Sequence, residues 1–100
     1  MLMEDALNQI LAFASEACEK ILNVPYIIQN KIIDDPDEPG EKLLIICVGI
    51  DEEDIKTVLE VWKHISNYVR EKISKELGEE YQKIVLIVVY GHKPPMLCRW

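Results

Sequence analysis

Apolar side chains recur at steps of three and four residues in two stretches of the chain, residues 2–22 and 51–77. This spacing is the period of an α-helix with one apolar face. Asp51 is the candidate N-cap of the second helix, and Gly78 is a candidate stop after it. The predicted apolar stripe of the second helix consists of Ile55, Val58, Leu59, Trp62, Ile65, Val69, Ile73 and Leu77.

Three further stretches, residues 25–33, 42–50 and 81–90, are rich in β-branched and aromatic side chains, which favour strands. In the second and third of them, apolar residues fill both alternating sets of positions, as is typical of strands buried on both faces. Residues 34–41 are dense in turn formers and predict a hairpin loop between the first two strands. Residues 91–100 form a tail that two consecutive prolines detach from the last strand, although it still carries apolar side chains.

The element order helix, strand, strand, helix, strand predicts one α/β domain over residues 1–100, of the two-layer α+β type. We expect a three-stranded mixed sheet with the second strand in the middle and the third strand parallel to it. Two long helices packed mainly on one face leave the other face without a cover. Each large aliphatic side chain left in water forgoes about 1.5–3 kcal/mol. We therefore expect a second copy of the chain to cover that face; the alternatives are helices split between the faces, another protein, or the tail.

At the level of topology, this order resembles the type II KH domains and the C-terminal cytoplasmic domain of cation diffusion facilitators. The first resemblance implies nucleic-acid binding through a GxxG loop, a motif that the sequence lacks. The second implies a dimerising metal sensor, with His92 at a strand end as its one counterpart here.

The charge balance narrows the classes of partner. Eighteen acidic and eleven basic residues give a formal charge of −7, which repels phosphate backbones and anionic lipid surfaces. We expect no nucleic-acid partner, and no membrane partner either, because the longest apolar run, residues 43–48, is too short to span a bilayer. Three widely separated cysteines indicate no disulfide framework and favour a reducing cytoplasm. The abundance of Ile, Glu and Lys resembles the composition of thermophile proteins.

A metal site is one candidate chemistry for the end of the chain. His92 and Cys98 are metal-ligating residue types, and the predicted topology brings His92 near the carboxylates of residues 51–54. The acidic loop 34–41 is too short for an EF-hand and holds two prolines, so it reads as a solvated hairpin tip. Cys47 lies in an apolar strand, where a thiol behaves as a small hydrophobic group.

An interaction surface is the other candidate. Val61, His64 and Tyr68 form a second stripe beside the main apolar face of the second helix, and the tail adds Leu97 and Trp100. A catalytic His needs a partner acid or nucleophile, and the sequence spacing implies none for His64. We therefore expect no catalytic residues and no cofactor, and we expect that the protein is not an enzyme. The sequence favours a small, non-enzymatic, homodimeric interaction or assembly module. The alternative is a metal-responsive regulatory domain that binds a divalent cation through His92, Cys98 and nearby carboxylates.

Overall fold

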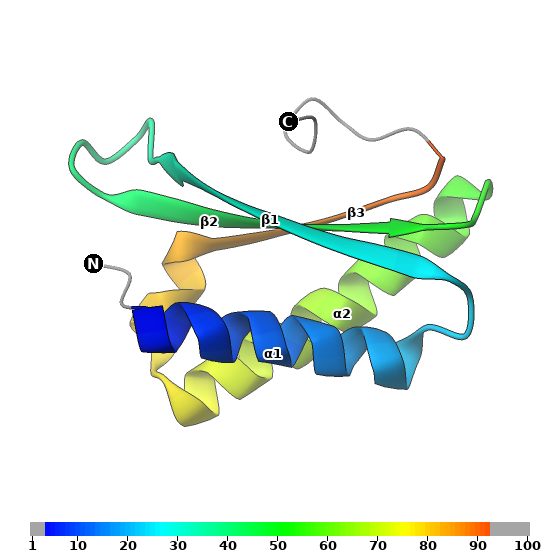
Figure 1. Cartoon of the computed structure of the whole chain (residues 1–100), viewed down its shortest axis with the longest axis horizontal. Helices are drawn as coiled ribbons and strands as arrows, with labels where there is room; N and C mark the ends of the chain where they lie inside the picture. Colours follow the sequence, from blue (N-terminus) through cyan, green and yellow to red (C-terminus); the bar gives the residue numbers. More distant parts are fainter. Residues whose placement is uncertain (1–3, 93–100) are drawn as a thin grey trace.

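The elements of the chain follow the predicted order in a computed structural model, which describes residues 4–92 (Figure 1). The helices are α1 (Glu4–Ile21) and α2 (Ile55–Glu76), and the strands are β1 (Tyr26–Asp34), β2 (Lys42–Ile50) and β3 (Val85–Tyr90). A short 3-10 helix, η1 (Glu79–Ile84), precedes the last strand. The predicted α-β-β-α-β fold class is confirmed.

The three strands form one mixed sheet in the order β1-β2-β3, so β2 lies in the middle as expected. β1 is antiparallel to β2, with Tyr26 opposite Ile50 and Asp34 opposite Lys42. β3 is parallel to β2, and its last residue, Tyr90, lies opposite Gly49. The β1–β2 hairpin thus closes at one end of the sheet, while β2 and β3 both end at the other.

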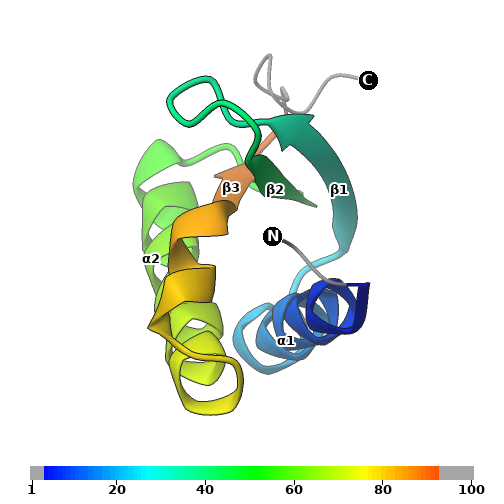
Figure 2. The same ribbon diagram turned by 90° about the vertical axis from the view of Figure 1, so that its left-hand side faces the viewer.

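Both helices pack on the same face of the sheet, as Figures 1 and 2 show from two directions. Alternate side chains of β2 enter the space between the sheet and the helices, where they meet two alanines of α1 and the buried apolar residues of α2. The buried members of this main core are Ile10, Ala14, Ala17, Cys18, Leu44, Ile46, Val48, Ile50, Ile65, Val69, Ile73 and Ile87. The small side chains of Ala14 and Ala17 lie in this core, and α1 packs closely against α2.

Two element boundaries differ from the prediction. α2 starts at Ile55 because Asp54, and not Asp51, caps it: the Asp54 carboxylate accepts a hydrogen bond from the Lys56 backbone N–H at 3.2 Å. Residues 79–84 form the 3-10 helix η1 in place of the start of a strand. The Gln82 side chain holds that segment against α2 by donating to the Arg70 carbonyl at 3.1 Å, so strand pairing begins only at Val85.

The predicted core stripe of α2 is wrong at its N-terminal end. Ile55 is 74% exposed and Leu59 is 53% exposed, whereas Ile65 further along the helix is fully buried. The helix axis is inclined to the sheet, so its first turns lie beside the sheet edge and its later turns lie beneath the sheet (Figures 1 and 2). Apolar spacing identifies the face of a helix, but the inclination decides which part of that face is covered.

Gly78 follows α2 with a φ of +109°, in agreement with its predicted role as a helix stop. The backbone N–H groups of Leu77 and Gly78 both donate to the Ile73 carbonyl at 2.8 Å and close the helix end. Within residues 4–92, neither helix is long and apolar enough to cross a bilayer.

Candidate interaction surface

The sheet has a second face, turned away from both helices (Figure 2). Strand register decides which side chains lie on it, because residues directly opposite each other on paired strands share a face. We call this surface the open face. From β1, β2 and β3 its residues are Ile27, Gln29, Lys31, Ile33, Leu43, Ile45, Cys47, Gly49, Leu86, Val88 and Tyr90.

The open face is apolar at its centre. Ile45 and Cys47 are 1% and 0% exposed, and they form a second apolar cluster, separate from the main core. Half-buried side chains pack against this pair, namely Ile33, Leu43, Val88 and Tyr90. On the flanking strands, Ile27 of β1 is 63% exposed and Leu86 of β3 is 37% exposed. The expectation that β2 carries buried side chains on both faces is met by the two clusters.

Cys47 is disulfide-bonded, although the spacing of the cysteines indicated no disulfide framework. Cys18, in the main core, is a free thiol. Burial raises the pKa of Cys18 to about 11, since the thiolate would lose its hydration. Cys98 lies outside the described residues. Sequence spacing shows only how far apart cysteines lie along the chain, whereas bonding depends on which of them the fold brings together.

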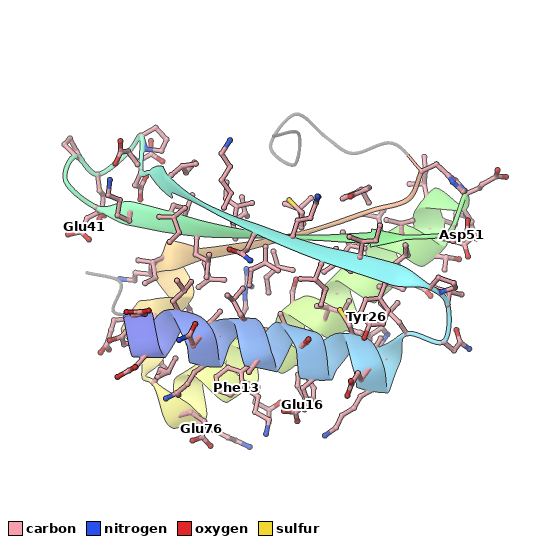
Figure 3. All side chains as sticks on the ribbon, in the orientation of Figure 1. Phe13, Glu16, Tyr26, Glu41, Asp51 and Glu76 are labelled. Carbon is pink, nitrogen blue, oxygen red and sulfur yellow. The ribbon has the colours of Figure 1, made fainter. Side chains whose placement is uncertain are left out.

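One end of the sheet gathers the ends of several elements: the start of β1, the ends of β2 and β3, and the loop that leads into α2. The Tyr90 ring lies across Gly49, where an added methyl carbon would come within 2.8 Å of the ring. At Gly91 an added methyl carbon would lie 2.2 Å from the Glu52 carbonyl oxygen, so only glycine allows β3 and this loop to approach so closely. In Figure 3, Asp51 marks this end of β2 and Glu41 marks the opposite end.

The predicted metal-ligating residues are partly brought together at the same end. The Nε2 atom of His92 lies 3.7 Å from a carboxylate oxygen of Asp51 and 3.8 Å from one of Glu53, and all three side chains are exposed. Across residues 4–92, no group of three or more His, Cys, Asp and Glu side chains is arranged to hold a metal ion. Cys98, the remaining predicted ligand, is outside this range.

The second stripe of α2 is divided between the interior and the surface. Val61 and Tyr68 are half-buried and pack against the main core, while His64 is exposed. Val61 and Tyr68 therefore contribute part of their apolar surface to the core of the same chain. The role of this stripe in an interface stays a prediction. Leu97 and Trp100, the other predicted interface residues, lie outside the described part of the chain.

Tyr68 also takes part in a polar contact between the helices that sequence reasoning missed. Its hydroxyl donates a hydrogen bond to the Glu16 carboxylate, and Lys20 and Lys72 place their ammonium groups 5.4 and 5.9 Å from the ring centroid. Figure 3 shows Glu16 on the side of α1 away from the sheet. The Tyr68 hydrogen bond and the Lys20 ammonium lower the pKa of Glu16. In the sequence, the only local sign of this contact between the helices is the four-residue spacing of Glu16 and Lys20, which lets the two side chains pair on one helix.

The open face and the adjoining end of the sheet offer apolar contact area with polar groups at the margin, which is suited to binding another surface. The exposed Ile55 and Leu59 continue the apolar area around that end, since both line a depression that also includes Gly91 and His92. Comparisons of the chain with protein-family models, with curated proteins and with solved structures give no match.

Proposed function

We propose that this protein is a non-enzymatic interaction or assembly module that works as a homodimer, with the open face as its self-association surface. One observation carries the proposal: all three strands place apolar side chains on a face that neither α1 nor α2 covers. In two-layer folds a sheet face of this kind is normally packed against another layer. A second copy of the same sheet supplies such a layer with matching shape and chemistry.

The energetics favour this assembly. Two sheets pack face to face about 10 Å apart, with their inner side chains interdigitated. Ile27 and Leu86 are exposed in the single chain, and each such aliphatic side chain contributes about 1.5–3 kcal/mol when its full surface is removed from water. The formal charge of −7 makes two copies repel each other, so added salt strengthens the dimer.

Sedimentation at micromolar concentration, in the presence of a thiol reductant, tests the proposal with a matched pair of variants. Ile27→Glu places a charge on the open face. Ile32→Glu places the same charge on the same strand at a residue that is 46% exposed and faces the helix side, opposite Leu44. We expect Ile27→Glu to weaken dimerisation at least tenfold and Ile32→Glu to leave it within twofold. A wild-type chain that sediments as an 11.6 kDa monomer throughout, or equal effects from both variants, refutes the open face as the dimer surface.

A thermal melt with zinc separates this function from the metal-responsive alternative. A ligand at 100 times its dissociation constant adds about 2.7 kcal/mol to the free energy of unfolding. A homodimeric interaction module shows no such gain, and His92→Ala leaves its melting temperature unaffected by zinc. A zinc-dependent rise that His92→Ala abolishes favours the alternative. Protein partners, with no nucleic acid and no membrane, complete the proposal.

A further inference from the structure

The two edges of the sheet have different surroundings. β3 forms one edge and lies on the side of α2 (Figure 2), where the Trp62 indole N–H donates to the Ile87 carbonyl of β3 at 2.8 Å. β1 forms the other edge, and within residues 4–92 no strand pairs with its outer side. Alternate backbone N–H and C=O groups of an edge strand point outward and can pair with a further strand. The outer edge of β1 is therefore the place at which this sheet can be extended.

β1 lacks most of the features that prevent such pairing in other proteins. Natural edge strands are often very short, bulged, or interrupted by proline. β1 is nine residues long, contains no proline, and keeps an unbroken register with β2 along its full length. Lys31 is the one charged residue inside it, and two of its isoleucines, Ile27 and Ile32, are exposed by 63% and 46%. This edge is long, regular and rich in exposed apolar side chains.

The sequence of β1 is nearly symmetric about its central residue, Asn30. On each side of Asn30 there is one polar residue followed by two isoleucines. These residues are Gln29, Ile28 and Ile27 on one side and Lys31, Ile32 and Ile33 on the other. Such a strand is complementary to an antiparallel copy of itself, because a two-fold axis brings residue i opposite residue j and residue j opposite residue i.

We infer that β1 pairs antiparallel with β1 of a second copy, around a two-fold axis at Asn30, so that two sheets join into one. In this register Ile27 lies opposite the partner's Ile33 on the open face. Ile28 lies opposite the partner's Ile32 on the helix side. Each exposed isoleucine of β1 thus gains an isoleucine as its cross-strand neighbour, and the helices of both copies stay on one face of the joined sheet.

Charge and overlap select this register over its neighbours. An axis at Lys31 places that lysine opposite its own copy, and like charges in directly opposite positions destabilise a strand pair. An axis at Gln29 places Lys31 opposite the partner's Ile27. Both shifts also shorten the paired length, whereas the axis at Asn30 pairs all of β1. β1 carries one Lys and one Asp, so the formal charge of −7 on the whole chain does not concentrate at this edge.

The edge pairing does not rest on the proposed function, because it uses the outer edge of β1 and leaves the open face accessible. A strand edge offers less apolar area than a sheet face, so we expect the pairing well above the micromolar range. There it joins two open-face dimers into an assembly of four chains, with two kinds of two-fold interface.

A thiol placed on the two-fold axis tests the pairing directly. Asn30 is exposed on the helix side of β1, and residues opposite each other in an antiparallel pair have Cα atoms about 4.5–5.5 Å apart, within the range of a disulfide. Ile32→Cys is the matched control on the same strand and face, because its two copies lie four residues apart along the pair, about 13 Å. Two introduced thiols and one molecule of glutathione disulfide give the bond between chains and two molecules of glutathione.

Peptide mapping by mass spectrometry reads the result and separates the introduced bond from the native cysteines. We expect Asn30→Cys to give a covalent dimer linked through position 30 of both chains, and Ile32→Cys to give no link between its introduced thiols. An Asn30→Cys chain without this linkage, or equal linkage in both variants, overturns the inference.

Sedimentation in the presence of a thiol reductant separates the edge from the open face. We expect the wild type to reach four chains, Asn30→Lys to weaken that step at least tenfold by placing two like charges at the axis, and Asn30→Ser to stay within threefold. Leu86→Glu charges the open face on β3, away from β1, and should stop at two chains while the Asn30→Cys linkage still forms in its background. If the linkage forms and Leu86→Glu assembles like the wild type, the open-face proposal fails and the edge pairing stands. If Leu86→Glu weakens assembly and no linkage forms, the edge pairing is wrong and the open-face dimer stands.

Discussion

The inclination of α2 predicts opposite outcomes for two aliphatic residues that its sequence pattern places on one stripe. Ile65→Ala and Leu59→Ala each delete three carbons, worth about 0.8 kcal/mol per fully buried group. Ile65 is fully buried among side chains from both helices and the sheet, so its truncation also leaves a cavity, and we expect a total cost of about 2–5 kcal/mol. Leu59 is 53% exposed, which halves the transfer free energy and leaves no cavity, so we expect about 1 kcal/mol or less.

Urea unfolding, followed by circular dichroism in the presence of a thiol reductant, measures both costs. Trp62 provides a second probe, because its indole N–H donates to the Ile87 carbonyl at 2.8 Å and its fluorescence reports the contact between α2 and β3. One kcal/mol shifts the melting temperature of a domain of this size by about 4–8 °C, so Ile65→Ala should melt at least about 8 °C below the wild type. A Leu59→Ala cost equal to that of Ile65→Ala would mean that the first turns of α2 are covered and that the inclination is wrong.

Three further predictions follow from single contacts. The pKa of Glu16 is below its usual 4.5 in the folded state, so its contribution to stability is complete above pH 4.5 and is lost as the pH falls through the folded pKa. In urea titrations at a series of pH values, the difference in unfolding free energy between the wild type and Glu16→Gln should therefore shrink below pH 4.5. Because burial raises the pKa of the Cys18 thiol to about 11, iodoacetamide at pH 8 should label it only after unfolding, and rapid labelling of the native chain would contradict its burial. Gly91→Ala should lower the free energy of unfolding by about 1–3 kcal/mol, because the new methyl carbon would lie 2.2 Å from the Glu52 carbonyl oxygen; an unchanged urea midpoint would show that the loop moves away freely.

The element order, the hairpin and the two amphipathic helices can all be predicted from local patterns in the sequence. Apolar side chains recur every two residues in a half-buried strand and about every 3.6 residues in an amphipathic helix, and turn residues mark the loop before Lys42. A short window of sequence is therefore enough to identify each of these elements. The same local signal showed that β2 is apolar on both faces, which the two core clusters confirm. Local pattern does not decide where α2 begins, because Asp51 and Asp54 are both residue types that can accept the N-cap hydrogen bond, and Asp54 is the one that does.

Which parts of these apolar faces are covered depends on how the helices and the sheet pack together in space. Leu59 and Ile65 belong to one stripe in the sequence, but their exposure differs because the inclination of α2 is set by packing along the entire helix. The hydrogen bond from Tyr68 to Glu16 likewise joins positions far apart in the chain. Pairings of this kind depend on how the layers meet in space, and no periodicity along the chain encodes them. The candidate site therefore came from strand register and helix placement, which gave a doubly apolar strand one face beneath the helices and one face turned away from them.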